Sequence, residues 1–192
     1  QGPGGRGRAN MGFANSTGCT SVWGATFPFN PYPFPWTSHL FHDAPSLAVG
    51  LFEGHMRKMA DGFVSIRRAQ KLLDGRYDPE SDEAFFSEFD WQQFTDDEFA
   101  LCPPLFAGGG DGAMMDIGFQ NLSRLMASGK PVRVVVVYTQ ANSAGGGQAC
   151  TAGFKCQTPE AFDAGPDPRY KDERRKELAL IAMAHRGAFD MQ

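Results

Sequence analysis

Hydrophobic positions between residues 43 and 75 recur mostly at helical spacing. Asp43 stands where a helix would be capped, Pro45 falls in the first turn, and Gly75 follows the last apolar residue. These residue types are typical of the beginning and end of a helix. We therefore predict a helix over 43–75 with one buried apolar face, which carries the following residues: Leu47, Leu51, Phe52, Met56, Met59, Phe63, Ile66 and Leu73.

A different pattern marks the C-terminal half of the chain. Residues 105–107 are apolar, residues 116–128 have helical spacing and end at Gly129, and residues 132–138 read VRVVVVY. A strand, a helix and a second strand predict a βαβ unit, and a nearly continuous β-branched run is typical of a strand covered on both faces in a parallel sheet. A last helix is predicted over 172–185. The fold class is therefore α/β, a mostly parallel sheet with helices on both faces.

Two other regions differ from this pattern. Residues 10–43 are rich in aromatic residues and proline, which predicts a short strand followed by ordered loops. Residues 78–98 contain nine acidic residues and neither Lys nor Arg, interleaved with aromatics. We interpret 76–100 as a solvated helical insertion that packs its aromatics inward, in preference to a docking surface for a basic partner. The whole chain, 1–192, is predicted to be a single domain with a flexible glycine-rich end at 1–10.

Composition narrows the functional classes. A chain of 192 residues with 42% hydrophobic content is typical of one soluble globular domain. A net charge of −4 and a pI near 5.5 argue against nucleic-acid binding, and no apolar run is long enough to span a membrane. The four cysteines form no CxxC or zinc spacing, and the N-terminal residues lack a secretion signal, so we expect a reducing, cytoplasmic location.

The segment GGGDG at 108–112 follows the first predicted strand of the βαβ unit. Glycines at such a position let backbone N–H groups approach a diphosphate, and the carboxylate of Asp111 suits a divalent cation that bridges phosphate oxygens. The segment fits neither the Walker pattern nor the GxGxxG fingerprint of dinucleotide binding. By itself it allows two interpretations, a ligand-binding loop or only a tight connection.

A second glycine-rich segment, TQANSAGGGQ at 139–148, follows the next predicted strand. Parallel strands place such loops at one edge of the sheet, where open α/β folds bind ligands. Thr139 offers a hydroxyl and Ala141 a carbonyl oxygen to the cation that Asp111 would hold. An all-oxygen set of this kind suits Mg²⁺, so the pair of loops favours a site for a diphosphate and a metal ion.

These residues resemble a known family. GDG followed about thirty residues later by TxxxSxxGGQ is similar to the thiamine diphosphate motif of the pyruvate:ferredoxin oxidoreductases, and more broadly of the 2-oxoacid:ferredoxin oxidoreductases. The resemblance implies the diphosphate half of a thiamine diphosphate-binding fold. It extends over most of the chain, through ANSTGCTS at 14–21, the LF.D segment at 40–43, GGDGAMMDIGFQNL, LMASGKPVRVVVV and RKELALIAMAHRG.

Carried over to this chain, the resemblance implies that Mg²⁺ is held by Asp111, Thr139 and the carbonyl of Ala141. It also implies that Cys19 ligates a [4Fe-4S] cluster, whereas without the family Cys19 would be interpreted as a small buried residue. Cys102, Cys150 and Cys156 match no family ligand and are expected to be buried or free thiols. The residues implied to surround the diphosphate are Gly110, Gly112, Ala113, Thr139, Gln140, Ala141, Asn142, Ser143 and Ala144.

The chain also departs from the family pattern. The other cluster cysteines of the family are absent, so we expect a fragment or a processed piece. Ala144 stands where the family has an asparagine used near the substrate, which indicates a different substrate or a lost activity. We favour loop roles for His39 and His42 over roles facing the substrate. The acidic and amide residues typical of the family near the aromatic loop are replaced here by Ser38, His42, Ala44 and Ser46.

The function implied by the resemblance is oxidative decarboxylation of a pyruvate-like 2-oxoacid, with electron transfer to the iron–sulfur cluster and then to ferredoxin or flavodoxin, and with coenzyme A as acyl acceptor. A pyrimidine-binding domain or subunit of the same multi-subunit enzyme is the expected partner. Two alternatives remain open from the residues: a subunit of a non-redox thiamine diphosphate decarboxylase or synthase, and a non-catalytic structural subunit that retains the fold.

Overall fold

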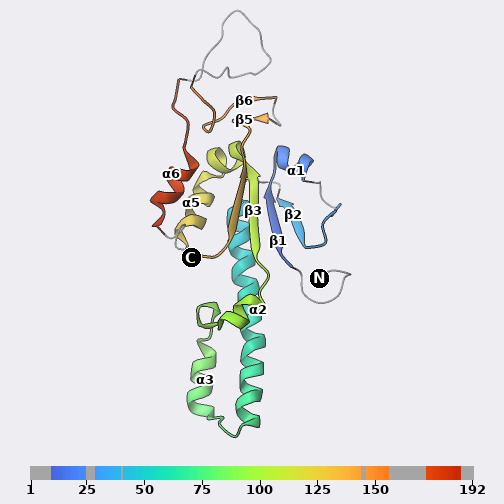
Figure 1. Cartoon of the computed structure of the whole chain (residues 1–192), viewed down its shortest axis with the longest axis vertical. Helices are drawn as coiled ribbons and strands as arrows, with labels where there is room; N and C mark the ends of the chain where they lie inside the picture. The colour runs from blue at the N-terminus through green and yellow to red at the C-terminus, as the bar shows by residue number, and fades with distance from the viewer. Residues whose placement is uncertain (1–9, 25–28, 40, 144–145, 156–171, 187–192) are drawn as a thin grey trace, which may run out of the picture. The chain divides into compact units, whose positions relative to one another are not determined.

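The computed structural model describes residues 10–24, 29–39, 41–143, 146–155 and 172–186 (Figure 1). The chain forms two compact units. The first contains residues 1–49 and 104–192, and the second contains residues 50–103. None of the helices in the described residues is both long and apolar enough to cross a membrane.

Four parallel strands form the sheet of the first unit, in the order β2-β1-β3-β4. They are β1 (Gly12–Ser16), β2 (Trp36–His39), β3 (Leu105–Gly110) and β4 (Arg133–Val137). Helix α5 (Phe119–Ala127) lies between β3 and β4 in the chain, as the crossover between parallel neighbours requires. The predicted α/β class and the βαβ unit are confirmed.

The proline-rich segment contains more regular structure than predicted. It forms the short helix α1 (Cys19–Trp23) and the strand β2, where we had predicted only loops after the first strand. Pro35 immediately precedes β2, and its carbonyl accepts a hydrogen bond from the N–H of Phe13 at 3.1 Å. Proline lacks a backbone N–H donor but keeps its carbonyl acceptor. It can therefore stand at the start of an edge strand without interrupting the hydrogen bonds between strands.

Strand β3 continues through the glycines that we had placed in a loop after residue 107. A Cβ atom on Gly108 would collide with the ring of Phe13, and one on Gly109 would lie 3.0 Å from the Cβ of Ser16. The glycines therefore let side chains from the neighbouring β1 pack directly on the backbone of β3. Pairing with β1 and β4 on its two sides keeps this glycine run extended.

The valine strand is less covered than its sequence predicts. β4 is the last strand of the described sheet, and Val135 is 44% exposed. The prediction that both faces are covered is wrong for the part of the chain that the structure describes. An uninterrupted apolar run indicates burial, but the sequence does not say which segment supplies the cover.

Helical structure after β3 starts earlier than predicted, and the last helix is shorter. Residues Ala113–Ile117 form a π-helical turn (η3), which precedes α5. Gly118 lies between η3 and α5. The residue is glycine because a Cβ there would overlap the backbone oxygens of Ala113 and His42. The last helix, α6, is Leu178–Ala184, whereas we predicted 172–185.

The predicted long helix is confirmed as α2 (Ala44–Leu73), most of which lies in the second unit. Its apolar face divides: Phe52, Met56 and Phe63 are buried, while Leu51, Ile66 and Leu73 are exposed. The acidic segment forms α3 (Pro79–Ser87), the 3₁₀ turn η2 (Trp91–Gln93) and α4 (Asp96–Ala100). Its aromatic rings pack with those of α2, as in the edge-to-face contacts Phe52 to Trp91 and Phe63 to Phe94.

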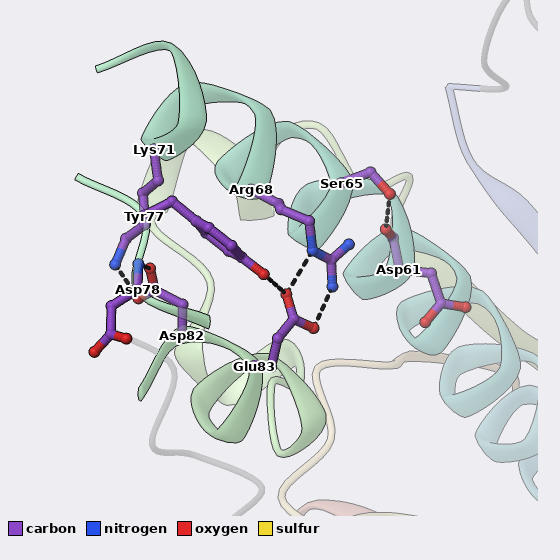
Figure 2. A network of polar contacts seen from close by, with 8 residues as sticks. All are labelled: Asp61, Ser65, Arg68, Lys71, Tyr77, Asp78, Asp82 and Glu83. Carbon is purple, nitrogen blue, oxygen red and sulfur yellow. Dashed lines mark hydrogen bonds and ion pairs between the residues drawn. The ribbon is translucent and has the colours of Figure 1, made fainter. Parts of the chain in front are cut away.

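Several carboxylates of the acidic segment are paired with basic side chains of α2. Glu83 accepts two hydrogen bonds from Arg68, each 2.7 Å long, and one from the hydroxyl of Tyr77 at 2.8 Å (Figure 2). The bonds from Arg68, followed by that from Tyr77, lower the pKa of Glu83 to about 2. Lys71 pairs with Asp82 in the same network, and Arg67 with Glu98. These pairs support the interpretation of 78–98 as a segment that packs within the fold.

Candidate cofactor site

The two glycine-rich segments meet at the C-terminal ends of the adjacent strands β3 and β4. Asp111 directly follows β3 and is 1% exposed. One oxygen of its carboxylate, Oδ2, accepts hydrogen bonds from the backbone N–H groups of Thr139 at 3.1 Å and Gln140 at 2.5 Å. The buried aspartate therefore holds the entrance of the second loop against the end of the first strand.

The other carboxylate oxygen faces a group of oxygen atoms. Oδ1 of Asp111 accepts a hydrogen bond from the N–H of Gly112 at 3.0 Å and lies 3.4 Å from the hydroxyl oxygen of Thr139. That hydroxyl lies 3.0 Å from the carbonyl oxygen of Ala141. Adjacent ligands of an octahedral Mg²⁺ are about 3.0 Å apart, given metal–oxygen distances of about 2.1 Å. The Thr139 hydroxyl is thus spaced from the other two oxygen atoms predicted as metal ligands at distances that suit this ion.

A cavity of about 190 Å³ adjoins these oxygen atoms. Its wall contains every predicted cofactor residue except two: Gln140, which contacts Asp111 instead, and Ala144, which lies outside the described residues. The side chain of His39 also lies outside the description, whereas His42 lines the cavity. The residues of the wall are Thr17, Gly18, Cys19, Thr20, His42, Gly110, Asp111, Gly112, Ala113, Val137, Thr139, Ala141, Asn142 and Ser143.

Two glycines of this wall differ in what surrounds the position of their absent side chain. A Cβ on Gly112 would overlap the side-chain oxygen of Asn142, because the two loops approach each other closely there. At Gly110 the nearest atom to an added Cβ is the carbonyl oxygen of Val137, 4.0 Å away. A side chain at 110 would therefore project into open space beside the cavity. Together the two glycines form a cradle: Gly110 leaves room for a ligand to reach the backbone, and Gly112 makes room for the side chain of Asn142.

The backbone of the second loop is strained next to Asp111. Gln140 has φ of +63°, and in the described chain no other non-glycine residue has a positive φ. Such a conformation is uncommon and persists where surrounding contacts hold it. The hydrogen bond from the N–H of Gln140 to Asp111 is such a contact. The carboxylate therefore stabilises the turn that sets the direction of the next carbonyl, that of Ala141.

The described wall carries little charge. Asp111 is acidic, and of the described lining residues only His42 can carry a positive charge. An anionic ligand placed here therefore needs a cation to offset its charge and that of Asp111. A divalent metal ion held by the three oxygen atoms would provide this compensation.

Cys19 lies at the start of α1 and lines the cavity, half-buried. Cys102 and Cys150 are buried, as predicted, and form no disulfide among the described residues. Burial raises the pKa of Cys150. Cys156 lies outside the described residues. Within the described ranges, no three His, Cys, Asp or Glu side chains are grouped to hold a metal ion. Cys19 is thus placed beside the candidate site without further cysteine ligands from these ranges.

Sequence reasoning did not single out Thr17, Gly18, Thr20 and Val137, which also line the cavity. The first three directly follow β1, at the same edge of the sheet as the two glycine-rich loops. The rule that ligands bind at the carboxyl ends of parallel strands could have found them, once β1 was placed beside β3. That pairing joins residues far apart in the sequence.

A larger groove of about 660 Å³ lies in the second unit. It is lined by charged residues of both signs, and Arg68 and Glu83 on its wall are bonded to each other. It contains neither a glycine cradle nor the buried aspartate with converging oxygens. We therefore place the candidate site at the strand ends of the first unit.

No protein-family model matches the chain. Several individual proteins are similar to it in sequence. The chain is 27% identical over 219 residues to a pyruvate-flavodoxin oxidoreductase of Klebsiella pneumoniae, a match that covers 95% of this chain and 18% of that protein. It is 26% identical over 217 residues to the pyruvate:ferredoxin oxidoreductase of Moorella thermoacetica, covering 91% of this chain and 18% of the relative. A mitochondrial pyruvate dehydrogenase [NADP(+)] of Euglena gracilis is 25% identical over 206 residues, with 90% of this chain and 11% of the relative covered.

The resemblance predicted from the motifs is confirmed by these matches. The chain is similar, over about nine tenths of its length, to one part of several pyruvate oxidoreductases. It spans less than a fifth of the length of these relatives.

Proposed function

We propose that this chain binds the diphosphate of thiamine diphosphate together with Mg²⁺, as part of an enzyme that oxidatively decarboxylates a pyruvate-like 2-oxoacid. The arrangement of Asp111, Thr139 and Ala141 at the ends of β3 and β4 carries the proposal. Their oxygen atoms converge beside a glycine cradle in a cavity of about 190 Å³. The similarity to pyruvate oxidoreductases supports the choice of this cofactor among diphosphates.

The donor set and the cradle fit the group. Asp111, Thr139 and the Ala141 carbonyl would supply three oxygen ligands to Mg²⁺, which would offset the charge of the diphosphate. Gly110 leaves the backbone accessible, and the helical segment that begins at Asp111 lines the cavity with its first residues, where a diphosphate would meet backbone N–H groups. Ser143 and Asn142 line the opposite loop and offer further polar atoms.

When bound, thiamine diphosphate supplies a thiazolium ring that attacks the 2-oxo carbon and accepts the electrons released on decarboxylation. The residues of this chain hold the cofactor in position and do not themselves react with the substrate. Asp111 and Thr139 anchor the diphosphate through the metal ion, and the cavity wall at Thr17, Gly18 and Cys19 limits the space beyond it. Fixing the cofactor in this way converts binding energy into orientation of the reacting atoms.

Electron transfer is the redox part of the proposal. Cys19 is the proposed ligand to a [4Fe-4S] cluster, because it lines the same cavity and an electron donor and acceptor must lie close together. The remaining ligands, the pyrimidine-binding domain or subunit and the coenzyme A site belong to other parts of the complete enzyme. Two of the relatives are named for flavodoxin and ferredoxin, so we propose one of these as electron acceptor. The proposed location is the cytoplasm, from the cysteine usage of the sequence.

The test is calorimetric titration of thiamine diphosphate, with and without Mg²⁺, into the complete protein that contains this chain. We expect binding that depends on Mg²⁺ and that Asp111→Asn weakens at least about tenfold, because a charged ligand is lost. The exposed Asp97 on α4, changed to Asn, is the control and should have no effect. Binding that neither Mg²⁺ nor Asp111→Asn changes would refute the proposal.

A further inference from the structure

The loop that supplies Thr139 and Ala141 is a small two-stranded ribbon. β5 (Ala141–Asn142) pairs with β6 (Gln148–Ala149) in antiparallel register. Strands of two residues give little stability by themselves, and an isolated two-stranded ribbon is marginal in water. The positions of its oxygen atoms therefore depend on what holds its two ends.

The exit of the ribbon is held by a second aspartate. Asp116 accepts hydrogen bonds from the N–H of Thr151 at 3.1 Å on Oδ1 and 3.3 Å on Oδ2, and Oδ1 also accepts one from the Thr151 hydroxyl. That hydroxyl also lies 3.4 Å from the carbonyl oxygen of Met115. Lys176 reinforces the contact, since its N–H donates to the carbonyl of Thr151 at 2.7 Å and its ammonium group donates to that of Met115.

The entrance and the exit are thus bound in the same way by one short segment. Asp111 accepts from the backbone of Thr139 and Gln140, and Asp116 accepts from the backbone of Thr151. The π-helical turn Ala113–Ile117 carries Asp116 after Asp111. A π turn is rare and frequently occurs at functional sites.

We propose that Asp116 is a positioning residue for the metal and diphosphate site, acting through Thr151. It does not line the cavity, so it has no direct contact with a ligand there. By holding residue 151 it keeps the ribbon closed, and this keeps the carbonyl of Ala141 near the hydroxyl of Thr139. The inference rests on the proposed function and adds to it a residue outside the cavity wall.

The experiment compares Asp116→Ala, Asp116→Asn and Thr151→Val with wild type in the complete protein. Hydrogen exchange of residues 139–151 is measured without cofactor, and the Kd of thiamine diphosphate is measured over a range of Mg²⁺ concentrations. Asp61→Asn, on the exposed surface of α2, is the matched control for loss of one carboxylate.

We expect Asp116→Ala to raise exchange in 139–151 and to weaken the apparent affinity for Mg²⁺ about tenfold, because hydrogen bonds to a carboxylate are lost. Added Mg²⁺ should restore binding, which a general loss of folding would not allow. Asp116→Asn retains one acceptor oxygen and should therefore show less exchange in 139–151 and tighter binding than Asp116→Ala. Thr151→Val removes only the hydroxyl bonds and should have a smaller effect, and it serves as the test if Asp116→Ala does not fold.

The outcomes separate this inference from the proposed function. If wild type binds thiamine diphosphate with Mg²⁺ while the Asp116 and Thr151 variants bind equally well, the positioning role is overturned and the proposed function stands. If wild type does not bind, the proposed function fails, and exchange alone decides whether Asp116 holds the ribbon. Unchanged exchange in the variants overturns the inference in either case.

Discussion

The N–H of Thr139 donates a hydrogen bond of 3.1 Å to the carboxylate of Asp111, across 28 positions of sequence. This bond joins the ends of two neighbouring parallel strands. Because Asp111 is buried and its second oxygen faces the Thr139 hydroxyl, the same pair fixes the loop and places two oxygen atoms where the proposed cation would bind. The backbone contact and the hydroxyl contact can be separated by mutation.

Thr139→Val keeps the backbone bond to Asp111 and removes the hydroxyl. We expect it to weaken Mg²⁺-dependent binding of thiamine diphosphate at least about tenfold, with little change in folding stability, because one metal ligand is lost. Thr139→Ser retains the hydroxyl and should bind nearly as wild type does. Calorimetric titration of both variants is the measurement, and equal affinity of the Val and Ser variants would remove Thr139 from the ligand set.

Gly112→Ala tests the close approach of the two loops. An added Cβ would overlap the side-chain oxygen of Asn142, so this exposed side chain must turn away and give up its hydrogen bond to the carbonyl of Ala149, at a cost of about 1 kcal/mol. We expect the variant to bind thiamine diphosphate more weakly, and Asn142→Ala in the same protein to restore part of the affinity. Binding measurements on the two single variants and the double variant give the coupling between the positions.

Gly50→Ala is the control for this series. Gly50 lies within α2, and nothing stands within 4 Å of an added Cβ. Alanine there should raise the free energy of unfolding by about 0.5–1 kcal/mol, since glycine is a poor helix former. If Gly112→Ala behaved like Gly50→Ala, the steric argument for the cradle would be wrong.

Cys19→Ser tests the redox part of the proposal. Purified without oxygen, the complete wild-type protein should show the broad visible absorption of an iron–sulfur cluster, and the variant should lose some or all of it. Serine preserves the shape of the cavity wall, so thiamine diphosphate should still bind. Cys102→Ser, in the second unit, is the matched control and should leave the spectrum unchanged. Absence of cluster absorption from wild type would favour a non-redox thiamine enzyme.

The pKa of Glu83 predicts how the folding stability of the second unit responds to acid. Its pKa in the folded protein is lowered to about 2, chiefly by hydrogen bonds from Arg68, so its ionised form stabilises the fold. The contribution is fully present above the ordinary value of about 4.3 and is lost as pH falls toward the folded value. The pair is half-exposed, so solvent screening keeps the effect modest.

Urea unfolding of wild type and Glu83→Gln from neutral pH to about pH 2 measures this contribution. We expect the difference in the free energy of unfolding between the two proteins to shrink below about pH 4.3. Glu88→Gln, an exposed position at the end of α3, is the control. A difference that stayed constant over this range would show that Glu83 acts through something other than its charge.

Local patterns in the sequence were sufficient for the elements whose neighbours in the chain determine them. The caps and spacing at residues 43–75 identified α2 nearly to its ends, and the β3–α5–β4 unit followed from its hydrophobic periodicity. The elements that were missed depend on distant partners. β2 is a strand because β1 pairs with it, and the glycines of β3 are extended because strands lie on both sides.

The candidate site divides in the same way. By itself the sequence determined which residue types stand after the two strands, and hence the proposed oxygen ligands Asp111, Thr139 and Ala141. Only the tertiary structure decided that the Thr139 hydroxyl lies 3.4 Å from Asp111 and 3.0 Å from the Ala141 carbonyl, that Gly112 faces Asn142, and that Asp116 holds Thr151. The physical reason is that the chemical character of a residue is a property of its own side chain, and hydrophobic periodicity is a property of a local segment, so both can be read from the sequence. Hydrogen bonds across 28 or 35 positions form only when the sheet has brought the strand ends together.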